Sequence, residues 1–230
     1  MEITAEKIMQ QLSAGTQVAG VIAVFGEEGY YKDKIAAALP RAVFGDAAPE
    51  DREITVFERD TDIKEISAAV NTYPFFSGRS LVIIKDEKLW GGKDGGEKRK
   101  QQQEELAELL ADVPEHCQVL LLGEKIDKRG KLYKSLLKTA AMVECKSLKS
   151  YQLKPWLDEQ AALRGCRFDY EASQTIMEYL SVTDNAPLLL LEQEIEKLSV
   201  YAGERKIWTK DDIEQTFAAL PEVSRFALLN

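Results

Sequence analysis

The sequence predicts a parallel α/β domain of the phosphate-loop type, followed by a small helical domain. Two observations predict this fold class. Short apolar runs alternate with helical segments over about the first two-thirds of the 230 residues, which is the pattern of a parallel sheet with helical crossovers. From Pro155 onward the apolar runs stop and the sequence reads as helices only.

The expected strands are continuous apolar runs of the kind buried on both faces of a parallel sheet. They lie at 18–25, 54–57, 81–84, 119–122 and 141–143. A helix after the second run begins at Asp62, which has capping-box spacing to Glu65, and Ile63, Ile66 and Val70 form its apolar face. The polar stretch 91–103 is expected to form a loop that leads into the next helix.

In the helical region, proline and capping residues mark where helices begin. Helices are expected at 155–164, 170–180, 187–201 and 209–219. Pro155 and Pro187 suit first-turn positions, where a missing N–H costs nothing. Thr209 is a good N-cap, because Asp211 and Asp212 follow it near the positive end of the helix.

Composition excludes several classes of function. Three separated cysteines and one histidine form neither a disulfide framework nor a histidine-rich metal site, so we expect no metal and no cofactor. His116 and Cys117 are adjacent, but neighbours on a strand point to opposite faces, which argues against a nucleophile–base pair. We expect His116 in a surface loop.

No membrane span or signal peptide is evident, so we expect a cytoplasmic protein.

The loop after the first strand resembles a phosphate loop that has lost its function. On the GxxxxGK[ST] pattern, Gly26 and Lys32 fit, but Tyr31 replaces the second glycine and Asp33 replaces the magnesium-binding hydroxyl. A tyrosine side chain obstructs close backbone approach, so this degenerate loop is not expected to bind ATP. Asp86 and Glu87, after the third strand, are interpreted as loop residues and not as magnesium ligands.

An aromatic pair is the stronger candidate for a functional site. Tyr73, Pro74, Phe75 and Phe76 follow the helix that begins at Asp62, and adjacent aromatic residues cannot easily enter one core together. The pair therefore either anchors a partner's pocket, or one ring plugs the sheet edge while the other covers it. The usual burial of aromatic residues favours the second interpretation on the residues alone.

The net charge of −9 disfavours a stand-alone nucleic-acid binder. One stretch, 124–138, is locally basic. Its basic residues are Lys125, Lys128, Arg129, Lys131, Lys134 and Lys138. A solvated helix face is the favoured interpretation unless the protein works beside DNA.

Four motifs carry a resemblance to a known family. They are Phe25-Gly26-Glu27-Glu28 with Tyr30, the segment 73–82, Lys154-Pro155-Trp156-Leu157, and the segment 192–198 with Tyr201. In order and spacing across nearly the whole chain, the sequence resembles the delta subunits of bacterial DNA polymerase III clamp loaders.

The resemblance implies an AAA+ α/β domain at 1–148, a helical lid at 149–220, and a linker at 221–230 toward a C-terminal collar domain that is missing here. It implies a subunit without an active site of its own, which binds the sliding clamp (the beta subunit) and opens it for loading onto primed DNA. Its other partners would be the gamma/tau and delta prime subunits of the holoenzyme.

In that family the clamp contact is a hydrophobic pair before the third strand. The pair falls on Phe75 and Phe76, with Tyr73 and Pro74 beside it, and this reverses the preference for burial. Lys125, Lys128, Arg129 and Lys131 become candidates for facing DNA in the assembled loader. Two alternatives stay open: an active AAA+ ATPase with an atypical phosphate loop, and a stand-alone protein-interaction module.

Overall fold

A computed structural model describes residues 1–16, 18–58, 61–85, 96–181 and 186–217. The chain divides into two compact units, Met1–Lys146 and Ser147–Asn230. Within the described parts, no helix has the length and apolar character needed to cross a membrane.

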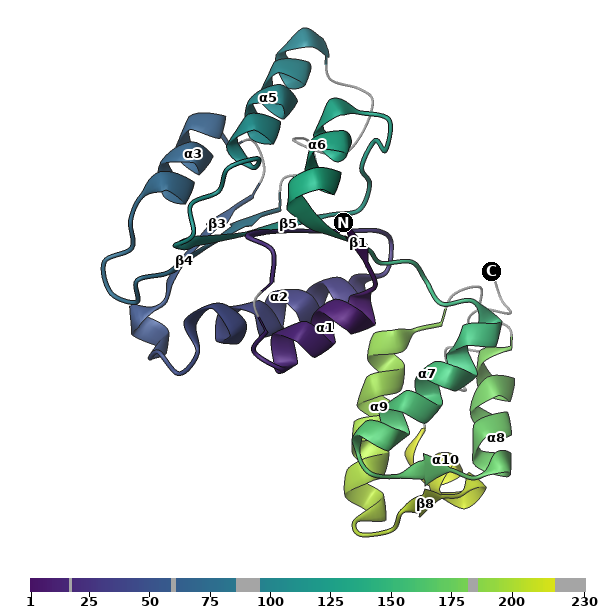
Figure 1. Ribbon diagram of the computed structural model, residues 1–230. Helices are drawn as coiled ribbons and strands as arrows, with labels where there is room; N and C mark the ends of the chain where they lie inside the picture. The colour runs from purple at the N-terminus through teal and green to yellow at the C-terminus, as the bar shows by residue number, and fades with distance from the viewer. Residues whose placement is uncertain (17, 59–60, 86–95, 182–185, 218–230) are drawn as a thin grey trace. The chain divides into compact units, whose positions relative to one another are not determined.

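The first unit is a parallel sheet covered by helices on both faces (Figure 1). Across the sheet the strands run β1 (Glu2–Ile3), β6 (Ala140–Glu144), β2 (Val21–Phe25), β5 (Cys117–Gly123), β4 (Ser80–Ile84) and β3 (Glu53–Phe57). Every neighbouring pair is parallel. The predicted parallel α/β fold is confirmed. The two-residue strand β1 was not predicted, because so short a segment has no apolar run.

Five α-helices are described in this unit, among residues 1–16, 18–58, 61–85 and 96–146. They are α1 (Ala5–Ser13), α2 (Gly29–Phe44), α3 (Ile63–Asn71), α5 (Gly96–Leu109) and α6 (Lys131–Thr139), and a short 3₁₀ helix η1 spans Pro49–Asp51. Helices α3, α5 and α6 lie on one face of the sheet, and α1 and α2 on the other (Figure 1). The predicted loop at 91–103 is wrong over its second half, because α5 begins at Gly96; residues 91–95 lie outside the described residues.

The core forms between the sheet and its helices. Asp62 caps α3, as predicted, by accepting a hydrogen bond from the Lys64 N–H at 3.0 Å. Ile66 and Val70 of α3 are fully buried in the same cluster as Leu106 of α5 and Leu136 of α6. All five residues of β2, and all five of β4, are buried, as expected for central parallel strands.

The second unit is helical with one small parallel sheet, so the expectation of helices only is wrong in one respect. Its elements are α7 (Ser150–Leu163), β7 (Arg167–Phe168), α8 (Tyr170–Leu180), α9 (Leu188–Ala202), β8 (Ile207–Trp208) and α10 (Lys210–Thr216). Strands β7 and β8 pair through Phe168 and Trp208. The two rings meet edge to face with centroids 5.2 Å apart, so the pairing buries aromatic surface that a two-residue pattern does not reveal.

Pro155 lies inside α7 and not in its first turn. The helix begins earlier because Gln152 supplies an N-terminal acceptor: its side-chain oxygen accepts a hydrogen bond from the Lys149 N–H at 3.0 Å. Pro187 directly precedes α9, which agrees with its expected role as a helix starter.

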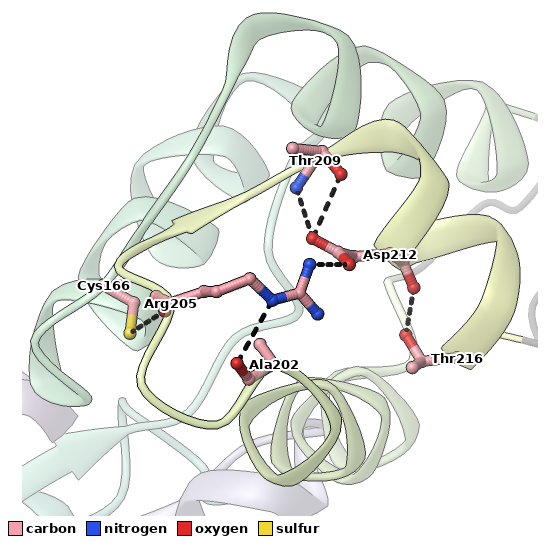
Figure 2. A network of polar contacts seen from close by, with 6 residues as sticks. All are labelled: Cys166, Ala202, Arg205, Thr209, Asp212 and Thr216. Carbon is pink, nitrogen blue, oxygen red and sulfur yellow. Dashed lines mark hydrogen bonds and ion pairs between the residues drawn. The ribbon is translucent and has the colours of Figure 1, made fainter.

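A buried carboxylate organises the end of the second unit (Figure 2). Asp212 is 3% exposed and accepts hydrogen bonds from the Thr209 N–H at 2.9 Å and the Thr209 hydroxyl at 3.0 Å. Its other oxygen pairs with Arg205 Nη1 at 2.6 Å. Arg205 Nε donates to the carbonyl oxygen of Ala202, the last residue of α9. Through Arg205, the carboxylate therefore links the end of α9 to the first turn of α10, and Thr209 is the N-cap that the sequence predicts.

Candidate interaction site and degenerate phosphate loop

The backbone of the loop after β2 is bonded to neighbouring strand ends. The Gly26 N–H donates to the carbonyl oxygen of Glu124 at 3.0 Å, and the Glu28 N–H donates to that of Cys145 at 3.2 Å. In a working phosphate loop such N–H groups cradle the anion. Here these two donors are already used within the protein.

The N-terminus of α2 is capped by a carboxylate of the chain itself. Glu28 is the N-cap, and its Oε1 accepts a hydrogen bond from the Tyr30 N–H at 3.0 Å. A helix N-terminus attracts anions through its free N–H groups and its dipole. The Glu28 carboxylate thus lies at the helix N-terminus, which is the kind of position at which anions bind.

The loop residues singled out from the sequence also serve the fold. Lys32 Nζ donates to the carbonyl oxygen of Gly26 at 2.8 Å, which closes the loop on itself. Tyr31 is buried, with its ring centroid 5.1 Å from that of Tyr30, whereas Asp33 is exposed. Helix α2 begins at Gly29, so all three side chains stand on its first two turns.

The cap at Glu28 gives a measurable prediction. Glu28→Ala should lower the free energy of unfolding by about 1 kcal/mol, because the Tyr30 N–H loses its acceptor. The matched control is Glu27→Ala, which removes the same charge from an exposed neighbour and should change stability by less than about 0.5 kcal/mol. Urea denaturation measures both variants. If Glu28→Ala and Glu27→Ala lower the free energy of unfolding equally, the lost charge and not the lost cap is responsible.

The described residues offer no group of three or more histidine, cysteine or acidic side chains placed to hold a metal ion. Asp86 and Glu87 lie outside the described residues.

Burial raises the pKa of the Cys117 thiol, against a smaller opposing effect from Ser80. Such a thiol is held in its neutral form, which is a poor nucleophile.

The aromatic pair lies on a tip between α3 and β4. The tip is defined by Tyr73 through Arg79. Phe75 is 89% exposed and Phe76 is 71% exposed, with ring centroids 5.8 Å apart. Neither ring plugs the sheet edge, so the interpretation favoured on the residues alone is wrong. Two large apolar rings held in water at one point form a candidate anchor for a partner.

Several contacts fix the backbone of this tip. Pro74 is buried. The exposed Tyr73 ring lies against the His116 ring, with centroids 5.1 Å apart. His116 lies in the turn directly before β5, as expected of a loop residue, but it is half-buried and not fully exposed. The Ser77 hydroxyl donates to the carbonyl oxygen of Arg79 at 2.7 Å.

A residue that the sequence analysis missed also contacts the tip. The Phe75 N–H donates to the Glu53 carboxylate, with both oxygens 2.8 Å from the nitrogen. The two residues are far apart in sequence, and only the pairing of β3 with β4 brings them together. No local motif signals this contact.

The basic stretch does not form one helix face. Lys125, Lys128 and Arg129 lie between β5 and α6, whereas Lys131 begins α6, and all four are exposed. Three of them are paired with acids: Lys128 with Glu144 at 2.8 Å, Lys131 with Glu104 at 2.6 Å, and Arg129 with Asp127 at 3.9 Å. Such surface pairs are weak and exchange readily for other anions.

Comparisons with known proteins support one family. The family model "DNA polymerase III, delta subunit" matches residues 25–146. The DNA polymerase III subunit delta of Bacillus subtilis (strain 168) is 29% identical over 217 residues, which cover 93% of this chain and 61% of that protein. The chain thus spans about three-fifths of the length of this relative.

Solved structures agree with the sequence comparisons. The Bacillus subtilis DNA clamp loader delta protein (YqeN) has a TM-score of 0.73 at 25% identity, covering 92% of this chain and 61% of that one. A chain of the HORMA:CdnC:Trip13 complex from E. coli MS115-1 has a TM-score of 0.52 at 14% identity, covering 86% of this chain and 73% of that one, which supports the fold alone. With more than half of its length matched by the family model and an AAA+-like fold shared with a clamp loader protein, the chain belongs to the DNA polymerase III delta subunit family.

Proposed function

We propose that this delta-family chain binds the sliding clamp through the Phe75–Phe76 tip and opens one interface of the clamp, so that it can be loaded onto primed DNA. The observation that carries the proposal is the exposure of both rings on a tip whose backbone is fixed. Rigid aromatic side chains that enter a pocket are typical interface hot spots, and we expect the two rings together to contribute about 2 kcal/mol or more.

The chain performs no chemical step in this proposal. Its phosphate loop uses the Gly26 and Glu28 N–H groups and the Lys32 ammonium within the protein. This argues against the alternative of an active ATPase. Its partners in a cytoplasmic DNA polymerase III holoenzyme would be the gamma/tau and delta prime subunits, and ATP hydrolysis elsewhere in the loader would control when the tip is presented.

To open the clamp, the chain needs only a higher affinity for the open clamp than for the closed clamp. A tip that binds the open clamp better than the closed clamp shifts the population toward the open form, by at most the difference between the two affinities. In this proposal 1–148 is the clamp-binding AAA+ domain and 149–220 the lid. The proposed linker, 221–230, lies outside the described residues.

The loop before α6 is the proposed DNA-facing surface. Lys125, Lys128, Arg129 and Lys131 are exposed and would approach phosphates in the assembled loader. Since DNA binding by exposed lysines is an electrostatic effect, this contact would weaken steeply with salt.

The test of the proposed function is binding to the sliding clamp of the same organism. Phe75→Ala/Phe76→Ala should weaken binding by about thirtyfold or more, equivalent to about 2 kcal/mol. The unfolding midpoint should hardly change, because neither ring is buried. Isothermal titration measures the affinity, and urea denaturation checks the fold.

Tyr170→Ala is the matched control, because Tyr170 is a 76% exposed aromatic residue of the second unit. It should leave the affinity unchanged. A folded double variant that binds the clamp as tightly as the wild type would refute the assignment of the tip.

A further inference from the structure

We propose that Glu53 is a positioning residue that holds the Phe75–Phe76 tip ready for its partner; this inference rests on the proposed function. The two rings contact each other, but this contact cannot fix their direction relative to the rest of the protein, since Phe75 is 89% and Phe76 71% exposed. The backbone that carries the rings must therefore be held by other contacts. The contact on Phe75 itself comes from Glu53.

The geometry of this contact is that of a charge-assisted hydrogen bond. The Phe75 nitrogen lies 2.8 Å from Oε1 and 2.8 Å from Oε2 of Glu53, so the N–H points between the two oxygens. Hydrogen bonds to a carboxylate are shorter and stronger than neutral ones. The bond directly restrains the residue with the more exposed ring.

The sheet holds Glu53 in place. Glu53 is the first residue of β3 and pairs with Ser80, the first residue of β4. The chain of the tip enters the sheet at Ser80, so the carboxylate reaches the tip from the neighbouring strand. By strand alternation Glu53 shares a face with Phe57, which packs against the core cluster that contains Ile66 of α3. The carboxylate thus lies on the face of the sheet that carries α3, the helix from which the tip departs.

The other contacts of the tip hold its two sides, and Glu53 holds the backbone at Phe75 between them. Pro74 and the Tyr73–His116 ring contact hold the side of the tip next to α3, and the Ser77–Arg79 hydrogen bond holds the side next to β4. Without Glu53, the middle of the tip would exchange between conformations in water. Fixing it before binding reduces the entropy lost when the rings enter a pocket.

The experiment compares Glu53→Ala, Glu53→Gln and Glu50→Ala with the wild type in two measurements on the 230-residue chain. One is affinity for the sliding clamp, and the other is hydrogen exchange of the Phe75 amide by NMR in the free protein. Glu50 is the matched control, because it is an exposed acid of η1 whose loss changes the net charge equally.

Glu53→Ala should weaken clamp binding about five- to tenfold and accelerate exchange of the Phe75 amide, with an unchanged unfolding midpoint. Glu53→Gln, which keeps a neutral acceptor, should recover part of both effects, and Glu50→Ala should have neither. The proposal is overturned if Glu53→Ala alters neither measurement, or if it accelerates exchange without loss of affinity.

The two proposals fail in different ways. A wild-type chain that does not bind the clamp would overturn the proposed function. It would also remove the partner for which Glu53 is proposed to hold the tip. The exchange rate of the Phe75 amide would then still decide whether Glu53 orders this segment. Loss of affinity in the phenylalanine variant but not in Glu53→Ala would retain the function and remove the role of Glu53.

Discussion

Gly26→Ala should destabilise the first unit by about 3–5 kcal/mol. A methyl group at this position would lie 1.9 Å from the carbonyl oxygen of Cys145 and 2.6 Å from its carbonyl carbon. These are backbone atoms at the end of β6, which cannot move aside as a flexible side chain would. The φ angle of +130° at Gly26 adds strain for any L side chain. Urea denaturation followed by circular dichroism measures the loss.

Gly29→Ala is the matched control for this prediction. Gly29 is the first residue of α2, and a methyl group there meets no atom within 4 Å. The replacement should be neutral within about 0.5 kcal/mol or slightly stabilising. If the two variants are equally stable, the close approach of the loop to Cys145 does not constrain this glycine.

Asp212→Asn should destabilise the second unit by about 2–4 kcal/mol. The substitution keeps the shape of the side chain but turns one buried oxygen into an NH₂ group. That group would face either the Thr209 donors or the Arg205 guanidinium, so one of these two sets of donors would lose its acceptor on the buried carboxylate. Asp211→Asn, on the exposed side of the same helical turn, is the control and should have little effect.

The loss from Asp212→Asn should also depend on pH. Burial by itself raises the pKa of the Asp212 carboxyl, but the Thr209 hydrogen bonds and Arg205 outweigh burial, so the pKa lies below its ordinary value of 3.8. A carboxyl with a lowered pKa contributes its full stability above the unfolded-state pKa and loses it as pH falls through the folded-state pKa. The difference between wild type and variant should therefore be largest near neutral pH and shrink in acid. A constant difference down to pH 3 would contradict the ionic role.

The strands of the sheet centre could be predicted because each is a continuous apolar run. Both β2 and β4 are buried along their whole length, and that burial requires apolar residues at every position. Strands β1, β7 and β8 could not be predicted, because two residues carry no periodicity. Backbone hydrogen bonds and the contact of Phe168 with Trp208 hold β7 to β8, and both join segments about 40 positions apart.

The candidate site was predictable in its residue types but not in its geometry. Adjacency marked Phe75 and Phe76 as unusual, yet the average burial of aromatic residues pointed to the core, and their exposure shows only in the fold. The contact of Glu53 with Phe75 depends on the register of two parallel strands. Lys32 fits the phosphate-loop pattern in sequence, whereas its ammonium contacts the protein's own backbone.

The hydrogen bonds that close the loop after β2 limit whether protein engineering could introduce nucleotide binding at this loop. Replacing Tyr31 by glycine and Asp33 by threonine would complete the GxxxxGK[ST] pattern without creating a receptor for nucleotide. The Gly26 and Glu28 N–H groups would still be bonded to the ends of β5 and β6, and the Glu28 carboxylate would still cap α2. Regaining a nucleotide would require separating the loop from both strands, and every intermediate variant would be less stable with no ligand to offset the loss. In the proposed function, loss of nucleotide binding would therefore be an evolutionary step that is difficult to reverse one substitution at a time.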